Sequence, residues 1–127
     1  ARMFYGCSSL TSLDLSGFNT AQVTDMKNMF HMCKALTSLD LSGFNTAMVT
    51  DMRYMFYYCY NLTSLDIHNF DISGVSNISY IFLSVGYEYN KSQDSPKTQI
   101  KVTSALKDAL VSKDVTTGDY AEYAVVQ

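Results

Sequence analysis

The chain has 127 residues, a length that suits one compact domain and is short for two. Hydrophobic residues make up 47% of it and charged residues 17%, which excludes an intrinsically disordered chain. The net charge of −3 and the scattered Lys and Arg residues argue against nucleic acid or an anionic membrane as a partner, and no apolar stretch is long enough for a membrane-spanning helix.

The first 80 residues are built on a 26-residue repeat. A Met-Phe pair recurs at residues 3, 29 and 55, with a weaker Ile-Phe pair at residue 81, and cysteines recur at residues 7, 33 and 59. Residues 3–28 and 29–54 are identical at 19 of 26 positions. Because one unit of this size cannot bury its own apolar face, we expect the units to stack as an α/β repeat solenoid.

Each unit is expected to contain two short elements. In LTSLDL, Leu13 and Leu15 alternate with polar residues, which predicts a strand with one buried face. In VTDMKNMFHMC, apolar residues recur every three or four positions, which predicts a short helix that Thr24 would cap. The apolar residues of this segment are Val23, Met26, Met29, Phe30 and Cys33. We therefore expect short parallel strands on one side of the stack and short helices on the other.

The unit MFxxCxxLTSLDLSGFNTxxVTDMxx resembles a known repeat family. Its L-x-x-L-x-L frame is that of leucine-rich repeats, and the whole unit is similar to the 26-residue repeat of BspA-like bacterial surface proteins. The resemblance covers residues 3 to about 80 and implies a right-handed leucine-rich-repeat stack. It also implies an extracellular protein on a bacterial cell surface, which acts in adhesion by binding proteins or glycans of host or neighbouring cells.

Two parts of the chain are expected: three 26-residue leucine-rich repeats in residues 1–80 and a mixed C-terminal cap in residues 81–127. In the cap, Ile100 and Val102 alternate with a lysine and keep the phase of the repeat strands after a nine-residue insertion, which predicts a fourth parallel strand. The predicted elements of the cap are a polar loop at 87–96, a strand at about 98–103, a helix at about 105–112 with Ser104 as its N-cap, and a last strand within 120–126.

The positions of the cysteines indicate a role in core packing and not in disulfide bonds or metal binding. All three fall on the predicted apolar face, so we expect buried, reduced thiols. Neighbouring units lie roughly 5 Å apart, which is longer than the Cβ separation of about 3.8 Å in a disulfide. The chain has no CxxC pair and no Cys/His cluster, so we expect no metal and no cofactor. The repeated aspartates lack a nucleophile and any sign of differing environments, so we also expect no enzymatic activity.

Asp14, Asp40 and Asp66 form a column on the predicted exposed face of the strands. Stacked carboxylates repel one another unless they are solvated, hydrogen-bonded to nearby Ser and Thr, or bridged by a cation such as Ca²⁺. The hydrogen-bonded or solvated column is the simpler interpretation, because one column supplies few of the oxygens that calcium requires. With His68, the column is a candidate partner-binding face.

The third unit carries four tyrosines, Tyr54, Tyr57, Tyr58 and Tyr60, around one predicted helix. Tyrosine combines a large rigid ring with a polar tip and is enriched at protein interfaces. One interpretation is that the C-terminal cap or its 87–96 loop covers these rings, and the other is that they form a partner-binding patch. The patch favours a recognition module, and the alternative function is a structural spacer in a larger surface protein.

Overall fold

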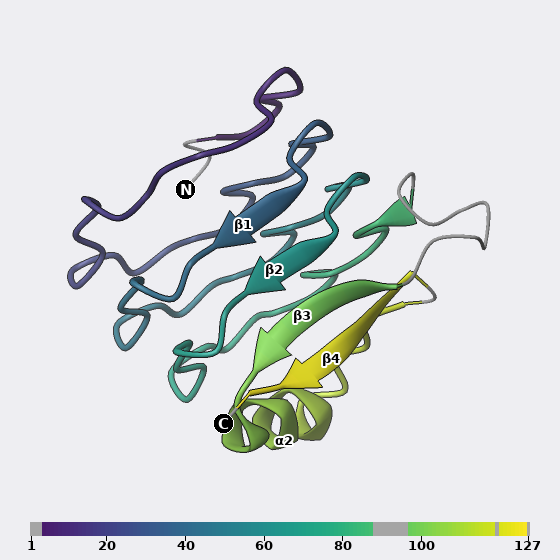
Figure 1. Cartoon of the computed structure of the whole chain (residues 1–127). Coiled ribbons are helices and arrows are strands. Elements are labelled where there is room, and N and C mark those ends of the chain that lie inside the picture. Colours follow the sequence, from purple (N-terminus) through teal and green to yellow (C-terminus); the bar gives the residue numbers. More distant parts are fainter. Residues whose placement is uncertain (1–3, 88–96, 119, 127) are drawn as a thin grey trace.

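The structure is a computed structural model that describes residues 4–87, 97–118 and 120–126. Four strands form one parallel sheet in the order β1-β2-β3-β4 (Figure 1). The strands are β1 (Ser38–Asp40), β2 (Ser64–Asp66), β3 (Thr98–Val102) and β4 (Ala121–Val125), and the helix α2 (Ser104–Ser112) connects the last two. The fold is therefore α/β, with a parallel sheet as its common element.

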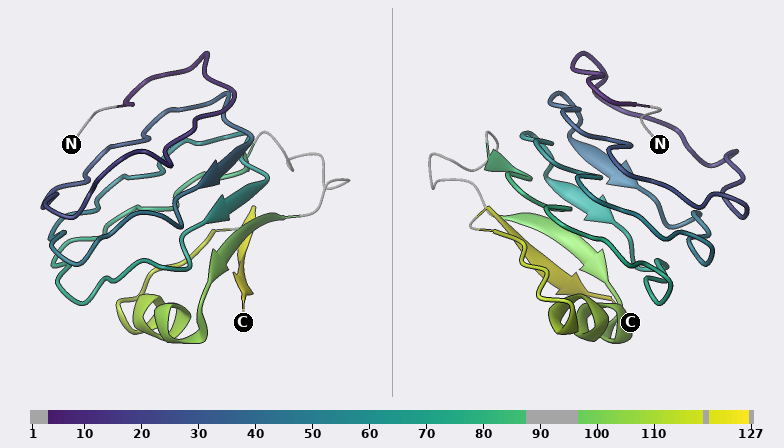
Figure 2. Two further views of the ribbon diagram at one scale, coloured as in Figure 1. Left: turned by 60° about the vertical axis from the view of Figure 1, so that its left-hand side comes forward. Right: turned by 180° about the vertical axis from the view of Figure 1, so that it is seen from behind.

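The 26-residue units lie side by side (Figures 1 and 2). Leu39 of β1 is paired with Leu65 of β2, one repeat length away. The same offset holds outside the sheet, where parallel bridges join Asp25 to Asp51 and Asp51 to Asn77. Between these bridged segments, alternate backbone N–H groups of one unit donate to carbonyl groups of the next. Across the junction of the first and second units the donors are Met26, Asn28, Phe30 and Met32, and the acceptors are Asp51, Arg53, Met55 and Tyr57.

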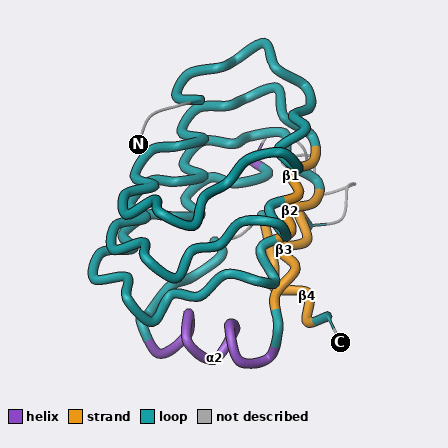
Figure 3. The backbone as a smooth tube through the Cα atoms, turned by 90° about the vertical axis from the view of Figure 1, so that its left-hand side faces the viewer, coloured by secondary structure: helices purple, strands orange, loops and turns teal. Residues whose placement is uncertain are grey.

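The prediction of a short helix in each unit was wrong, because these segments are chains of turns (Figure 3). Asn28 and Met32 adopt left-handed backbone conformations, with φ values of 61° and 63°, which an α-helix does not contain. Turn hydrogen bonds span three residues instead, from Met29 N–H to Met26 O and from Cys33 N–H to Phe30 O. These turns return an apolar side chain to the interior every three or four residues, so they imitate the spacing of a helix.

The first unit also departs from prediction. No strand is assigned to its LTSLDL segment, where Leu13 is only partly buried. A single backbone hydrogen bond, of 3.4 Å from Thr37 N–H to Thr11 O, links this segment to the residue that precedes β1. In the described part of the chain this unit has a neighbour on one side only, which leaves its strand segment without a full ladder.

The core consists of the repeated apolar columns. The rings of Phe30, Phe56 and Phe82 stack with centroids 5.8 and 6.0 Å apart, and all three side chains are buried. The three cysteines are free thiols, as expected. Cys33 and Cys59 are buried and donate from Sγ to carbonyl groups of the preceding unit, whereas Cys7 is only partly buried, so the prediction of burial was wrong for that residue.

The C-terminal part contains the predicted fourth parallel strand. Ile100 of β3 is paired with Leu65, which confirms the predicted phase, and β4 is the expected last strand. The helix begins as predicted, but its N-cap is Thr103 and not Ser104, because the Thr103 side chain accepts the backbone N–H of Leu106 at 3.1 Å. The predicted loop at 87–96 lies outside the described residues, except for its first residue.

Candidate functional site

The four predicted tyrosines lie together in one cluster. The rings of Tyr57 and Tyr58 stack with centroids 3.8 Å apart. The Tyr54 ring lies 5.4 Å from that of Tyr57, and the Tyr60 ring lies 5.2 Å from that of Tyr58. All four side chains are half-buried. The turn segment of the third unit thus gathers the rings that the sequence placed on a helix.

Aromatic residues of neighbouring units extend this cluster in both directions. The ring of His31 lies 4.8 Å from those of Tyr5 and Tyr57. Tyr80 stacks on Tyr54 at 5.5 Å, and Tyr87 lies 5.6 Å from Tyr60. We refer to the whole set as the aromatic surface, which comprises Tyr5, His31, Tyr54, Tyr57, Tyr58, Tyr60, Tyr80 and Tyr87.

The candidate residues predicted from the sequence did not include the outer members of the aromatic surface. These members are among its most exposed: 58% of Tyr80, 41% of Tyr5 and 38% of Tyr87 is accessible to solvent. The 26-residue period contains the signal that could have found three of the missed residues, because Tyr5 and His31 occupy the position of Tyr57 in their own units, and Tyr80 occupies that of Tyr54.

The backbone holds several of these tyrosines in an unusual conformation. Tyr54, Tyr58 and Tyr80 have φ values of 57°, 64° and 58°. A bulky residue in the left-handed region is destabilised by about 1–2 kcal/mol, and glycine and asparagine are tolerated best there. The first unit has Gly6 at the position of Tyr58, and Asn28 precedes Tyr54 in its column. The third unit therefore places aromatic rings where the backbone alone would favour small or amide side chains.

At neutral pH, Tyr57 presents an uncharged hydroxyl group to this surface. A side-chain hydrogen bond with Tyr58 raises the pKa of Tyr57 to about 12, with smaller contributions from desolvation and the neighbouring tyrosines. Lys34 adds a positive charge, since its Nζ lies 5.5 Å from the centroid of the Tyr60 ring. The surface therefore combines apolar ring area with hydroxyl groups and a cation, a composition typical of recognition surfaces.

The described part of the cap reaches the aromatic surface at one edge. Tyr87 contacts Tyr60 there, and Tyr120 lies 5.1 Å from Tyr87 on its other side. These contacts agree in part with the interpretation that the cap or its 87–96 loop covers the rings, and the rest of that loop, residues 88–96, lies outside the described residues. Tyr80, at the opposite edge, is the most exposed ring of the set.

The aspartate column closes turns at the ends of the strand segments. Asp14, Asp40 and Asp66 each accept, through Oδ1, the backbone N–H two residues later, at 3.0, 2.9 and 3.1 Å. In Asp40, hydrogen bonds from the side chain and then the backbone of Ser42 lower the pKa of the carboxyl group. The column therefore has hydrogen bonds to nearby residues, as the simpler interpretation of the sequence expects.

Two neighbours also change the electrostatics of this column. Asp66 Oδ1 lies 2.5 Å from His68 Nδ1, so the two predicted site residues are in contact. In β3 the residue paired with Asp66 is Lys101, so a lysine takes the next position of the aspartate column. The charge along the column therefore changes from negative at the aspartates to positive at Lys101. Among the residues that the structure describes, no group of three or more His, Cys, Asp or Glu side chains could hold a metal ion.

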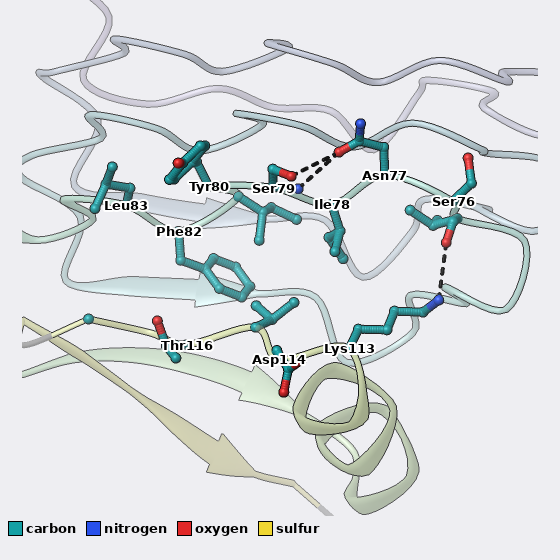
Figure 4. A pocket seen from close by; sticks show the side chains of 14 residues that line it. Ser76, Asn77, Ile78, Ser79, Tyr80, Phe82, Leu83, Lys113, Asp114 and Thr116 are labelled. Carbon is teal, nitrogen blue, oxygen red and sulfur yellow. Dashed lines mark hydrogen bonds between the residues drawn. The ribbon is translucent and has the colours of Figure 1, made fainter.

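A groove lies between residues 75–83 of the last repeat unit and the segment that follows α2, residues 113–116 and Gly118 (Figure 4). Its volume is about 670 Å³. Lys113 closes one end, where its Nζ donates to the carbonyl oxygen of Val75 at 3.1 Å. Tyr80 and Leu83 line the groove as well and are largely exposed, so the groove adjoins the aromatic surface.

Sequence comparison assigns the chain to a family. Residues 1–114 match the family described as "Mycoplasma protein of unknown function, DUF285". The chain belongs to this family. No curated protein and no solved structure matches it. The family region includes the three repeat units together with β3 and α2, but its description names no repeat class and no activity. No helix within the described ranges is long and apolar enough to cross a membrane.

Proposed function

We propose that the chain is a recognition module of a bacterial cell-surface protein, which binds a protein or glycan on a host or neighbouring cell through its aromatic surface. The observation that carries the proposal is the continuity of that surface across units, from Tyr5 through His31 and Tyr57 to Tyr60 and Tyr87. Exposed aromatic patches of this kind are uncommon on surfaces that bind nothing.

The proposal includes a leucine-rich-repeat solenoid of the BspA-like type. The repeated L-x-x-L-x-L frame, the parallel pairing at a 26-residue offset and the stacked phenylalanine rings support it. Such a scaffold presents a rigid surface, and a rigid surface loses little conformational entropy when a partner binds. The extracellular location and the role in adhesion follow from the resemblance of the repeat unit.

The aromatic surface is a stronger candidate than the aspartate column. The carboxylates of the column already accept hydrogen bonds from their own turns, and Lys101 adjoins Asp66. The tyrosine rings, in contrast, keep exposed area and offer hydroxyl groups. The strand face with Asp14, Asp40, Asp66 and His68 is therefore the second face to test.

The repeat itself supplies variants that remove the tyrosines without foreign residues. In the tyrosine variant, Tyr54→Asn, Tyr57→His and Tyr60→Lys introduce the residues that stand 26 positions earlier in the chain, and Tyr58→Gly introduces the one that stands 52 positions earlier. In the matched control, Asp14→Asn, Asp40→Asn and Asp66→Asn remove charge and keep the Oδ1 acceptor of each turn. Circular dichroism checks that both variants are folded.

Equilibrium binding to immobilised host matrix glycoproteins and bacterial glycans tests the proposal. We expect saturable binding to at least one member of the panel, an affinity loss of at least about tenfold in the tyrosine variant, and a change of less than about twofold in the control. Loss of binding in the control alone would assign recognition to the strand face. Absence of binding to every panel member would favour the structural spacer.

A further inference from the structure

The last repeat unit has a row of backbone N–H groups with no acceptor among the residues that the structure describes. Across the junction of the second and third units, the N–H groups of Met52, Tyr54, Phe56 and Tyr58 donate to the carbonyl groups of Asn77, Ser79, Ile81 and Leu83. The equivalent donors one unit later are Ile78, Tyr80, Phe82 and Ser84. Within the described part of the chain, no hydrogen bond is formed by these four N–H groups. The ladder that joins the units therefore ends in an open edge.

The edge is open because the chain leaves the repeat pattern after β3. Where a further turn segment would pair with residues 78–84, the chain instead forms α2 and continues through residues 113–118. Between this returning segment and residues 75–83 lies the groove of about 670 Å³ (Figure 4). This volume is in the range of ligand-binding pockets. The open edge is thus also one wall of a groove.

We propose that this groove binds a segment of a partner polypeptide in the turn conformation of residues 77–83, whose carbonyl groups accept the N–H groups of Ile78, Tyr80 and Phe82. The donors alternate along the chain, as they do wherever one turn segment of this molecule binds the next. The same positions in the two preceding units already hold the turn segment of the following unit by this pattern of hydrogen bonds. The partner segment would continue an interface that the molecule forms between its own units.

The side chains around the groove indicate what the partner segment carries. Tyr80 and Leu83 are 58% and 42% exposed, which provides an apolar wall for one or two apolar side chains of the partner. Thr116, on the opposite side, is exposed and leaves room beside the edge. In such complexes the main chain provides affinity, and pockets for alternate side chains provide specificity. The inference does not depend on the proposed function, because it rests on backbone donors.

Amide hydrogen exchange measured by NMR tests the inference on the full chain. The probe is a synthetic peptide with the sequence of residues 77–83, which is the stretch that pairs with the third unit, extended by two lysines for solubility. In the free chain we expect rapid exchange at Tyr80 and Phe82 and slow exchange at their equivalents, Tyr54 and Phe56. At about 1 mM peptide, exchange at Ile78, Tyr80 and Phe82 is expected to slow at least about tenfold.

Two variants show whether the peptide occupies the groove. Thr116→Trp fills the groove and is expected to abolish the protection. Val111→Trp, at a 55% exposed position of α2 outside the groove, is the matched control and is expected to leave it unchanged. The proposal is overturned if the peptide slows exchange at none of the three amides, or if it protects them equally in the Thr116→Trp variant.

Discussion

At the scale of single residues, most of the acidic and amide side chains of the repeat act on their own backbone. In the first unit Asp14, Asn19 and Asp25 each accept the N–H two residues later, and Asp40, Asn45 and Asp51 do the same in the second. These are the side chains that close Asx turns. These aspartates therefore have a structural role in the turns, which weakens the case for a ligand at the aspartate column.

These hydrogen bonds predict a loss of stability in acid. Bonds from Ser42 lower the pKa of Asp40 below its ordinary value of 3.8, and a bond from the Arg53 side chain does the same for Asp51. A carboxyl group whose pKa is lower in the folded state stabilises the fold above its unfolded pKa and loses this effect as the pH falls through its folded pKa. We expect the urea midpoint to be constant between about pH 7 and 5 and to fall below about pH 4.

The double substitution Asp40→Asn and Asp51→Asn is the control for this pH dependence. Both asparagines keep an acceptor for the turn but no longer titrate, so the fall in the urea midpoint should become shallower while the midpoint at pH 7 changes little. A fall of the same steepness in the double variant would show that other carboxyl groups cause the acid sensitivity.

Burial predicts that the cysteines differ in reactivity. Desolvation raises the pKa of Cys33 to about 11 and that of Cys59 well above its ordinary value, and both thiols lie in the core. Because the thiolate is the reactive form, a maleimide at about pH 8 should label Cys7 alone in the folded chain and all three thiols in denaturant. Mass spectrometry of the labelled chain measures this, and rapid labelling of Cys59 without denaturant would contradict the burial described here.

At the scale of the elements, the sequence predicts the strands well and the turn segments poorly. Alternation identified β1, β2 and β3, because a side-chain period of two has few other origins. The apolar spacing of three to four residues did not distinguish a helix from consecutive turns, since both return side chains to the same face. What decides between them is where the backbone N–H groups bind, and in Met26 and Phe30 they bind the next unit. The sequence of one unit does not contain that information.

Glycine substitutions in a turn segment distinguish these turns from a helix. Met32 has a φ of 63° and occupies the position of Gly6, so Met32→Gly should change the free energy of unfolding by less than about 0.5 kcal/mol, because relief of strain offsets lost contacts and chain entropy. Met29, which is buried, lacks this backbone conformation, and Met29→Gly should lose about 3 kcal/mol or more. Urea unfolding measures both, and a loss near 1 kcal/mol or more at residue 32 would indicate a helix.

The candidate site was likewise predicted in part. The composition of the third unit was enough to single out Tyr57 and Tyr58, because the excess of tyrosine is visible in the sequence alone. The contact of Tyr87 with Tyr60 agrees, at one edge of the surface, with the interpretation that the cap or its 87–96 loop covers the rings. Which residue makes that contact was not predictable, since it depends on how the chain leaves the repeat after residue 86. The open edge at Tyr80 has the same origin, because it depends on α2 replacing a turn segment.

At the scale of the whole molecule, the first unit is less buried than the second. Phe4, Cys7 and Leu10 are partly buried, whereas their equivalents Phe30, Cys33 and Leu36 have no exposed area. At the opposite end Leu106 and Leu110 of α2 join the core. In the proposed solenoid each unit is stabilised mainly by its neighbours, so the outermost uncovered unit should be the least stable.

Leu10 and Leu36 allow this gradient to be measured with one chemical change. They occupy equivalent positions in identical LTSLDLSGF segments, but Leu36 is fully buried and Leu10 is not. Leu36→Ala should reduce the free energy of unfolding by about 3 kcal/mol and Leu10→Ala by about 1 kcal/mol, because less apolar area and a smaller cavity are involved at the first unit. Urea denaturation of both variants in one buffer gives the comparison. Equal losses at the two positions would mean that the first unit is covered in solution, and the order of stability proposed here would then be wrong.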